Sequence, residues 1–127
     1  MNDQAFIQRA NQRVAEIKAQ LAALGDMHPG SLSRQYNVCG KPGCRCKDPH
    51  NPRRHGPYYQ ISYVHQGKST TRFVQRHLLG LVKTQLANYK RFRRLTEEWV
   101  ALALKIASRN RQAAVESAKP QSKQRRG

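Results

Sequence analysis

All three cysteines of the chain fall within eight residues, in the string Cys39-Gly-Lys-Pro-Gly-Cys44-Arg-Cys46. Two histidines, His50 and His55, follow shortly after it. Thiolates and imidazoles bind zinc in small structural sites, which have four such ligands in a tetrahedral arrangement. The spacing differs from the commoner pairs of cysteines separated by two residues. The sequence therefore predicts one Zn²⁺ held by Cys39, Cys44, Cys46 and one of the two histidines.

The choice between the two histidines rests on their neighbours. We expect His55 to be the fourth ligand, because it precedes Gly56-Pro57 and a strand that would return past the cysteines. His50 lies in a proline-rich bulge and stays the alternative. A second possibility is that the cysteines are buried as small apolar side chains, with both histidines in solvent. A redox role is disfavoured, since the chain has no pair of cysteines separated by two residues.

A chain of 127 residues with two polar ends can build only a small core, so a metal ion would help to stabilise it. Three cysteines cannot all pair in intramolecular disulfides, and a reducing compartment favours thiolates. The N-terminus lacks a basic stretch followed by a long apolar segment, and the longest apolar run, Trp99 to Leu104, is too short to span a bilayer. We therefore expect a cytoplasmic protein.

Two long segments have the heptad spacing of paired helices. The first, from Asp3 to Leu24, spaces its apolar residues alternately by three and four: Ile7, Ala10, Val14, Ile17, Leu21 and Leu24. The second, from about Gln75 to Glu116, repeats this spacing with Tyr89, Phe92, Thr96, Trp99, Ala103 and Ile106. The two seams could pair with each other or form a homodimeric coiled coil. The narrow seams do not suit a helix that lies on a membrane.

The segment between the helices predicts a small antiparallel sheet. Ser31 to Val38 is short and loosely alternating, and Tyr58 to Val64 and Ser69 to Val74 would pair around a turn at His65 to Lys68. Tyr59, Ile61 and Tyr63 would share one face of it. We therefore expect an α+β fold in which two long heptad-patterned helices flank a zinc-knuckle sheet of about three antiparallel strands. The expected segments are an N-terminal helix (1–26), a zinc-knuckle and hairpin module (27–75), a basic C-terminal helix (76–116) and a disordered basic tail (117–127).

The charge of the chain points to a polyanionic partner. Twenty-four Lys and Arg stand against seven Asp and Glu, which gives a formal net charge of +17. Few acidic residues interleave with the basic ones, so ion pairs along the helix cannot account for the excess. The expected nucleic-acid contacts come from the knuckle, the hairpin and the second helix: Arg34, Lys41, Arg45, Lys47, Arg53, Arg54, Lys68, Arg72, Lys90, Arg91, Arg93 and Arg94.

Several strings resemble a family of small bacterial proteins known only as a domain of unknown function. They are Pro29-Gly-Ser-Leu-Ser33, the cysteine string, His55-Gly-Pro-Tyr-Tyr59 and Gly67-Lys68, followed by a basic helix that begins near Val82. The resemblance covers roughly residues 29 to 106. It implies a metal site and a setting beside transposases or on mobile elements, and it supplies no activity.

Catalysis is not expected. The acidic residues are scattered, no Ser/His/Asp set or phosphate-binding glycine loop is present, and four protein ligands would close a zinc site to water. We expect a nucleic-acid-binding accessory protein of a transposase-type complex, in contact with DNA or RNA. The alternative is a coiled-coil dimer or adaptor that binds a transposase or another protein.

Overall fold

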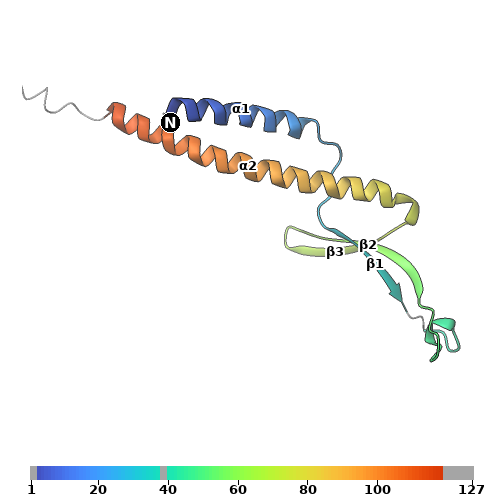
Figure 1. The fold of residues 1–127 in the computed structure, drawn as a ribbon. Coiled ribbons are helices and arrows are strands. Elements are labelled where there is room, and N and C mark those ends of the chain that lie inside the picture. Colours follow the sequence, from blue (N-terminus) through green and yellow to red (C-terminus); the bar gives the residue numbers. More distant parts are fainter. Residues whose placement is uncertain (1–2, 38–39, 119–127) are drawn as a thin grey trace, which may run out of the picture. The chain divides into compact units, whose positions relative to one another are not determined.

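The computed structural model describes residues 3–37 and 40–118. It is an α+β fold, as expected, with two helices and one three-stranded antiparallel sheet (Figure 1). The elements in chain order are α1 (Asp3–Ala22), β1 (Ser31–Asn37), a 3-10 turn (Arg45–Lys47), β2 (His55–His65), β3 (Lys68–Val74), a second 3-10 turn (Arg76–Leu78) and α2 (Leu79–Ala118). Within the described ranges, neither helix combines the length and the apolar character that crossing a membrane requires.

The chain divides into two compact units, which we describe in turn. The first contains residues 1–24 and 92–127, and the second contains Gly25–Arg91. Helix α2 contributes residues to both units. The expected tail at 117–127 lies outside the described residues except for its first two, which complete α2.

In the first unit, α1 packs antiparallel against the later part of α2 (Figure 1). The heptad residues Ala10, Val14 and Ile17 are buried, and so is Leu95 of α2. Because successive apolar residues are three and four apart, they form one stripe along α1, and this stripe faces a single partner helix. The apolar stripe of α1 is thus covered by α2 of the same chain.

The seam of α2 differs from the expected one at two positions. Ala103 is exposed, whereas Leu102 is half-buried and Leu95, which the expected seam omits, is buried. A leucine removes more apolar surface from water than alanine or threonine does. The helix therefore buries the leucine side of its heptad pattern, and this puts Ala103 on the solvent side.

Polar contacts fix the antiparallel alignment of the two helices. Arg13 of α1 donates to both carboxylate oxygens of Glu98, with distances of 2.6 Å from Nε and 2.8 Å from Nη2. Arg109 pairs with Asp3, the first residue of α1. The hydrogen bonds from Arg13 lower the pKa of Glu98 below the ordinary glutamate value of 4.5, and the same contact raises the pKa of Arg13.

In the second unit the strands follow each other in the order β1-β2-β3. Strand β2 pairs with β3 from His65↔Lys68 to Tyr59↔Val74, so the hairpin turn consists of Gln66 and Gly67. Both turn residues have positive φ, 50° and 77°. This geometry matches the right-handed twist of the strands and explains the glycine in the turn.

The loop residue His28 connects α2 with one face of this sheet. The backbone N–H of His28 donates to the carbonyl oxygen of Gln85 at 3.0 Å, and the ring of His28 packs edge-on against Tyr63 at 4.7 Å. Ile61 of β2 and Leu86 of α2 are both buried. The expected face of Tyr59, Ile61 and Tyr63 is therefore the packed one.

The Arg13–Glu98 pair generates a prediction about pH. Because its folded pKa is lowered, Glu98 stabilises the fold above its unfolded pKa, and this stabilisation is lost as the pH falls through the folded value. Glu98→Gln should lower the melting temperature at neutral pH, and the difference from the wild type should vanish in acid.

The control for this prediction is Glu97→Gln. Glu97 pairs with the exposed side chain of its helical neighbour, Arg93, at 3.1 Å. Its substitution should change the melting temperature less at every pH. Equal losses in the two variants, or a Glu98→Gln loss that does not shrink as the pH falls into the range where carboxylates are protonated, would contradict the assigned role.

Candidate metal centre

The loop that carries the cysteines joins neighbouring ends of two paired strands. Asn37 is the residue of β1 opposite His55, the first residue of β2. Gly56 follows with φ of 134°, and a Cβ there would come within 2.8 Å of the carbonyl oxygen of Gln35. A larger residue would push β2 away from β1 at this point. The glycine therefore allows the close pairing that positions His55.

The structure brings three of the predicted ligands together. The ligand atoms of Cys44, Cys46 and His55 all lie within 4.8 Å of one another. Sγ of Cys44 is 3.1 Å from Nε2 of His55. Cys46 is 2% exposed, and the other two side chains are half-buried. These side chains are close enough to bind one metal ion.

The local backbone explains how two cysteines separated by one residue reach the same point. The N–H of Lys47 donates to the carbonyl of Cys44 at 2.9 Å, which closes the 3-10 turn Arg45–Lys47. The N–H of Arg53 donates to the carbonyl of Arg45 at 2.9 Å, so the far side of the loop is tied back to this turn. The turn and this tie hold the two thiols near the start of β2.

His50, the alternative ligand, is not in the cluster. It is exposed, and its backbone N–H donates to Oδ1 of Asp48 at 2.9 Å. The same oxygen accepts a bond from the N–H of Asn51, which makes the bulge a turn capped by aspartate. Of the two histidines, the structure places His55 with the cysteines.

The fourth predicted ligand, Cys39, lies outside the described residues. It is two positions beyond Asn37, the residue paired with His55, so its place in the sequence is compatible with a role in the same site. Three protein ligands leave one position of a tetrahedral ion for a fourth, which we expect Cys39 to supply.

The composition of the loop favours a metal ion over a small apolar core. From residue 40 to residue 54, Cys46 alone is buried and Cys44 is half-buried, while every other residue is exposed. Ordering such a loop costs about 1–2 kcal/mol per residue in backbone entropy, and one buried thiol cannot offset this. A bound ion would supply the missing free energy, and thiolates with an imidazole are a donor set that suits Zn²⁺.

The predicted nucleic-acid residues are all on the surface. Each of the twelve is exposed, and ten of them belong to the second unit. Arg34 lies over the ring of Tyr36 at 5.9 Å. Five of the twelve surround the metal ligands in sequence: Lys41, Arg45, Lys47, Arg53 and Arg54.

Two aromatic residues on the surface were not among the predicted contacts. Tyr58 and Phe73 are exposed, and together with Arg76 they line a cavity of about 470 Å³. The period-two alternation of β2 already places Tyr58 on the face opposite Ile61. That signal was available in the sequence, but it does not show whether anything covers the second face.

Comparison with known families matches residues 7–84 of the chain to a profile described as Domain of unknown function (DUF6788). The chain belongs to this family. The matched region contains most of α1, the sheet, the cysteine loop and the first residues of α2, so the candidate metal centre is part of the DUF6788 region. No curated protein and no solved structure gives a significant match.

Membership of this family agrees with the resemblance seen in the sequence, which was to a family of unknown function. The matched region begins earlier than the resemblance, within α1, and ends earlier as well, near the start of α2. The family description assigns no chemistry to the DUF6788 domain. Its chemistry must therefore be inferred from the residues themselves.

The cluster predicts that the purified DUF6788 protein binds one Zn²⁺ per chain. Cys44→Ser, Cys46→Ser and His55→Ala should each weaken binding and destabilise the loop, because each removes a ligand. Metal content by mass spectrometry and the thiolate-to-metal absorption of the Co²⁺ form would report this.

His50→Ala is the matched control, since it removes a histidine from the same loop without touching the cluster. It should retain full zinc content. Loss of zinc in His50→Ala but not in His55→Ala would show the ligand assignment to be wrong, and a chain that folds unchanged without any metal would refute the site.

Proposed function

We propose that this protein binds nucleic acid through its exposed cations, around the cysteine loop, on the hairpin and along α2. The observation that carries the proposal is the charge of the second unit. Between Gly25 and Arg91 the chain has twelve Lys and Arg, against Asp26 and Asp48 as its only acidic residues. Such an excess attracts a polyanion, and phosphate groups are the commonest partner of exposed Arg and Lys clusters.

The acidic side chains of the molecule are poorly placed to neutralise this charge. The carboxylate of Asp48 accepts backbone N–H groups of its own loop. Asp3, Glu97 and Glu98 pair with arginines of the first unit. The second unit therefore keeps a large positive field, which a phosphate backbone would neutralise.

In this proposal the metal has a structural role. A closed site of three cysteines and His55 would hold the loop so that Lys41, Arg45 and Lys47 present their charges in a fixed arrangement. The proposal assigns no catalytic step to the chain. From the setting suggested by the resemblance, we place this binding in a transposase-type nucleoprotein complex, where the chain would act as an accessory protein.

A salt titration tests the proposal. If about eight phosphates are contacted, log K for duplex DNA should fall against log[salt] with a slope of about −7. Arg54→Gln and Arg72→Gln should each reduce the steepness of this slope by about 0.9, because each removes one phosphate contact. Fluorescence anisotropy of a labelled duplex would measure both effects.

Arg109→Gln is the control, because Arg109 pairs with Asp3 and lies over the ring of Phe6 at 4.0 Å. The slope should not change in this variant. No measurable binding at low salt, or an affinity that does not depend on salt, would overturn the proposed function.

A second candidate function, a protein-interaction module, is favoured by a separate observation. Val100, Leu104 and Val115 lie on one side of α2 and are exposed, Leu104 to 67%. An apolar stripe on a helix is a site at which a second helix can pack. The chain would then be a coiled-coil dimer or an adaptor for a partner protein.

Salt separates the two candidates. Two copies of a +17 chain repel each other, so a homodimer should become more stable as salt screens this repulsion, the reverse of nucleic-acid binding. Light scattering should then show a dimer at high salt for the wild type and a monomer for Leu104→Glu. A wild-type monomer at every concentration and salt level would exclude the dimer.

A further inference from the structure

The two faces of the sheet are chemically different. Residues directly opposite in neighbouring antiparallel strands share a face, so Leu32 and Arg72 lie on the face that buries Ile61. Tyr58, Phe73 and Val64 lie on the other side, where Ser62 and Thr71 meet at 3.0 Å between their hydroxyl oxygens. This second face carries exposed aromatic rings. We refer to it as the open face.

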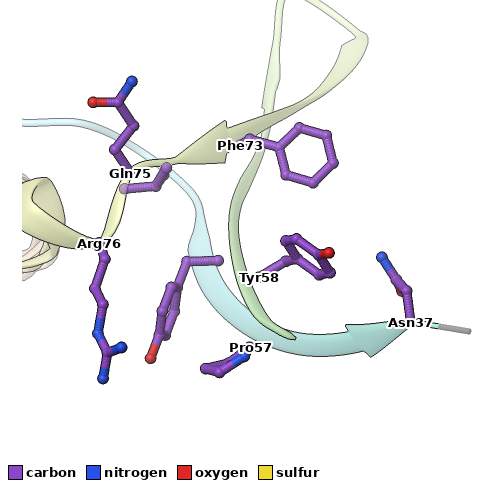
Figure 2. A pocket seen from close by; sticks show the side chains of 8 residues that line it. Asn37, Pro57, Tyr58, Phe73, Gln75 and Arg76 are labelled. Carbon is purple, nitrogen blue, oxygen red and sulfur yellow. The ribbon is translucent and has the colours of Figure 1, made fainter. Parts of the chain in front are cut away.

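Tyr58 and Phe73 form a shelf on the open face. Their ring centroids are 6.4 Å apart, with 68° between the ring planes, and Phe73 is 71% exposed while Tyr58 is 40% exposed. Figure 2 shows both rings projecting to the same side of the strands, with Asn37 beyond Tyr58. A phenylalanine left this far in water is costly unless a partner covers it.

The cavity beside this shelf has polar groups at its borders. It measures about 470 Å³ and lies at the end of the sheet, because residues of both faces line it (Figure 2). Tyr58 and Phe73 come from the open face and Tyr59 and Val74 from the other, and the remaining lining residues are Asn37, Pro57, Gln75 and Arg76. The amides of Asn37 and Gln75 can donate and accept hydrogen bonds, and the guanidinium of Arg76 adds a positive charge. The site therefore combines aromatic faces, hydrogen-bonding amides and a cation.

These three features match the parts of an unpaired nucleotide. A base offers a planar face for stacking and polar edges for the amides, and its phosphate can bind arginine. Arg53 and Arg54 are exposed and directly precede β2, so Arg54 is four residues before Tyr58 in the sequence and adds positive charge near the start of that strand. In a duplex the bases stack on each other, so their faces are not available to Tyr58 and Phe73.

We propose that the open face binds single-stranded nucleic acid, with one unpaired base stacked on Tyr58 and Phe73 and its flanking phosphates bound by Arg76 and Arg54. This proposal rests on the proposed function, since it specifies which nucleic acid the basic chain binds and where. The metal loop then borders the base site, because His55 is three residues before Tyr58 on β2. Single-stranded DNA and single-stranded RNA both offer this site a stackable base with its phosphate.

Binding of oligothymidylate and oligouridylate of about 16 nucleotides, compared with a duplex, tests the proposal. Tyr58→Ala and Phe73→Ala should each weaken single-strand binding about 5- to 150-fold and leave duplex binding unchanged. Tyr58→Phe and Phe73→Tyr keep the rings and should keep the affinity. Val64→Ala, an exposed apolar position on the same face, is the matched control and should bind as the wild type does.

The outcomes separate this proposal from the proposed function. Wild-type protein that binds neither polymer nor duplex overturns both. If the wild type binds the polymers and both Phe73→Ala and Tyr58→Ala bind them equally well, the base site alone is overturned. The relative affinity for oligothymidylate and oligouridylate identifies DNA or RNA as the ligand.

Cross-linking supplies a readout that does not depend on the variants. The wild-type chain is irradiated with an oligonucleotide that contains 5-iodouracil, and the adduct is mapped by mass spectrometry. An adduct on Tyr58 or Phe73 is expected, and adducts confined to other residues overturn the proposal. If circular dichroism shows that an alanine variant is unfolded, the cross-linking result alone tests whether a base contacts Tyr58 or Phe73.

Discussion

The loop between β1 and β2 has almost nothing to bury, and this constraint shapes the second unit. Residues 40–54 are exposed apart from two cysteines, yet the loop returns its chain to a strand paired with the one it left. Hydrogen bonds such as that from Arg53 to Arg45 define its path, but bonds at an exposed surface compete with water. An ion shared by Cys44, Cys46 and His55 would join both sides of the loop through bonds that water does not replace so easily. The exposed arginines of the loop can then face solvent without loss of stability.

The sequence predicted the fold well where the pattern was dictated by one dominant requirement. Heptad spacing identified both helices, because burying a narrow apolar stripe needs that period, and the glycine after Gln66 identified the hairpin turn. The prediction was less accurate along α2, where two sets of residues fit the heptad period. Along α2, Thr96 and Ala103 fit the period as well as Leu95 and Leu102 do, and only packing against α1 selects the leucines.

The candidate metal cluster was likewise predicted in part from the sequence. Residue chemistry pointed to three cysteines and favoured His55, and the structure brings Cys44, Cys46 and His55 together. That His50 lies apart from them depends on an aspartate-capped turn at Asp48, which the chemistry of the ligands does not reveal. The open face could not be predicted, because alternation assigns Tyr58 and Phe73 to a face without showing what covers it. That information lies in the tertiary packing, in which Ile61 of the opposite face and Leu86 of α2 are the buried residues.

The Cys44-Cys46-His55 cluster and the open face share a strand, so an ion bound at the cluster would affect more than the loop itself. His55 begins β2, Gly56 allows the close approach of β1, and Tyr58 follows as the first aromatic residue of the open face. Asn37, opposite His55, also lines the cavity beside that ring. A ligand bond to His55 would therefore fix the end of the sheet at which the base is proposed to stack. If both proposals hold, loss of a bound ion would free His55 and the surrounding arginines, and nucleic-acid affinity would then fall even though no phosphate or base need touch the ion.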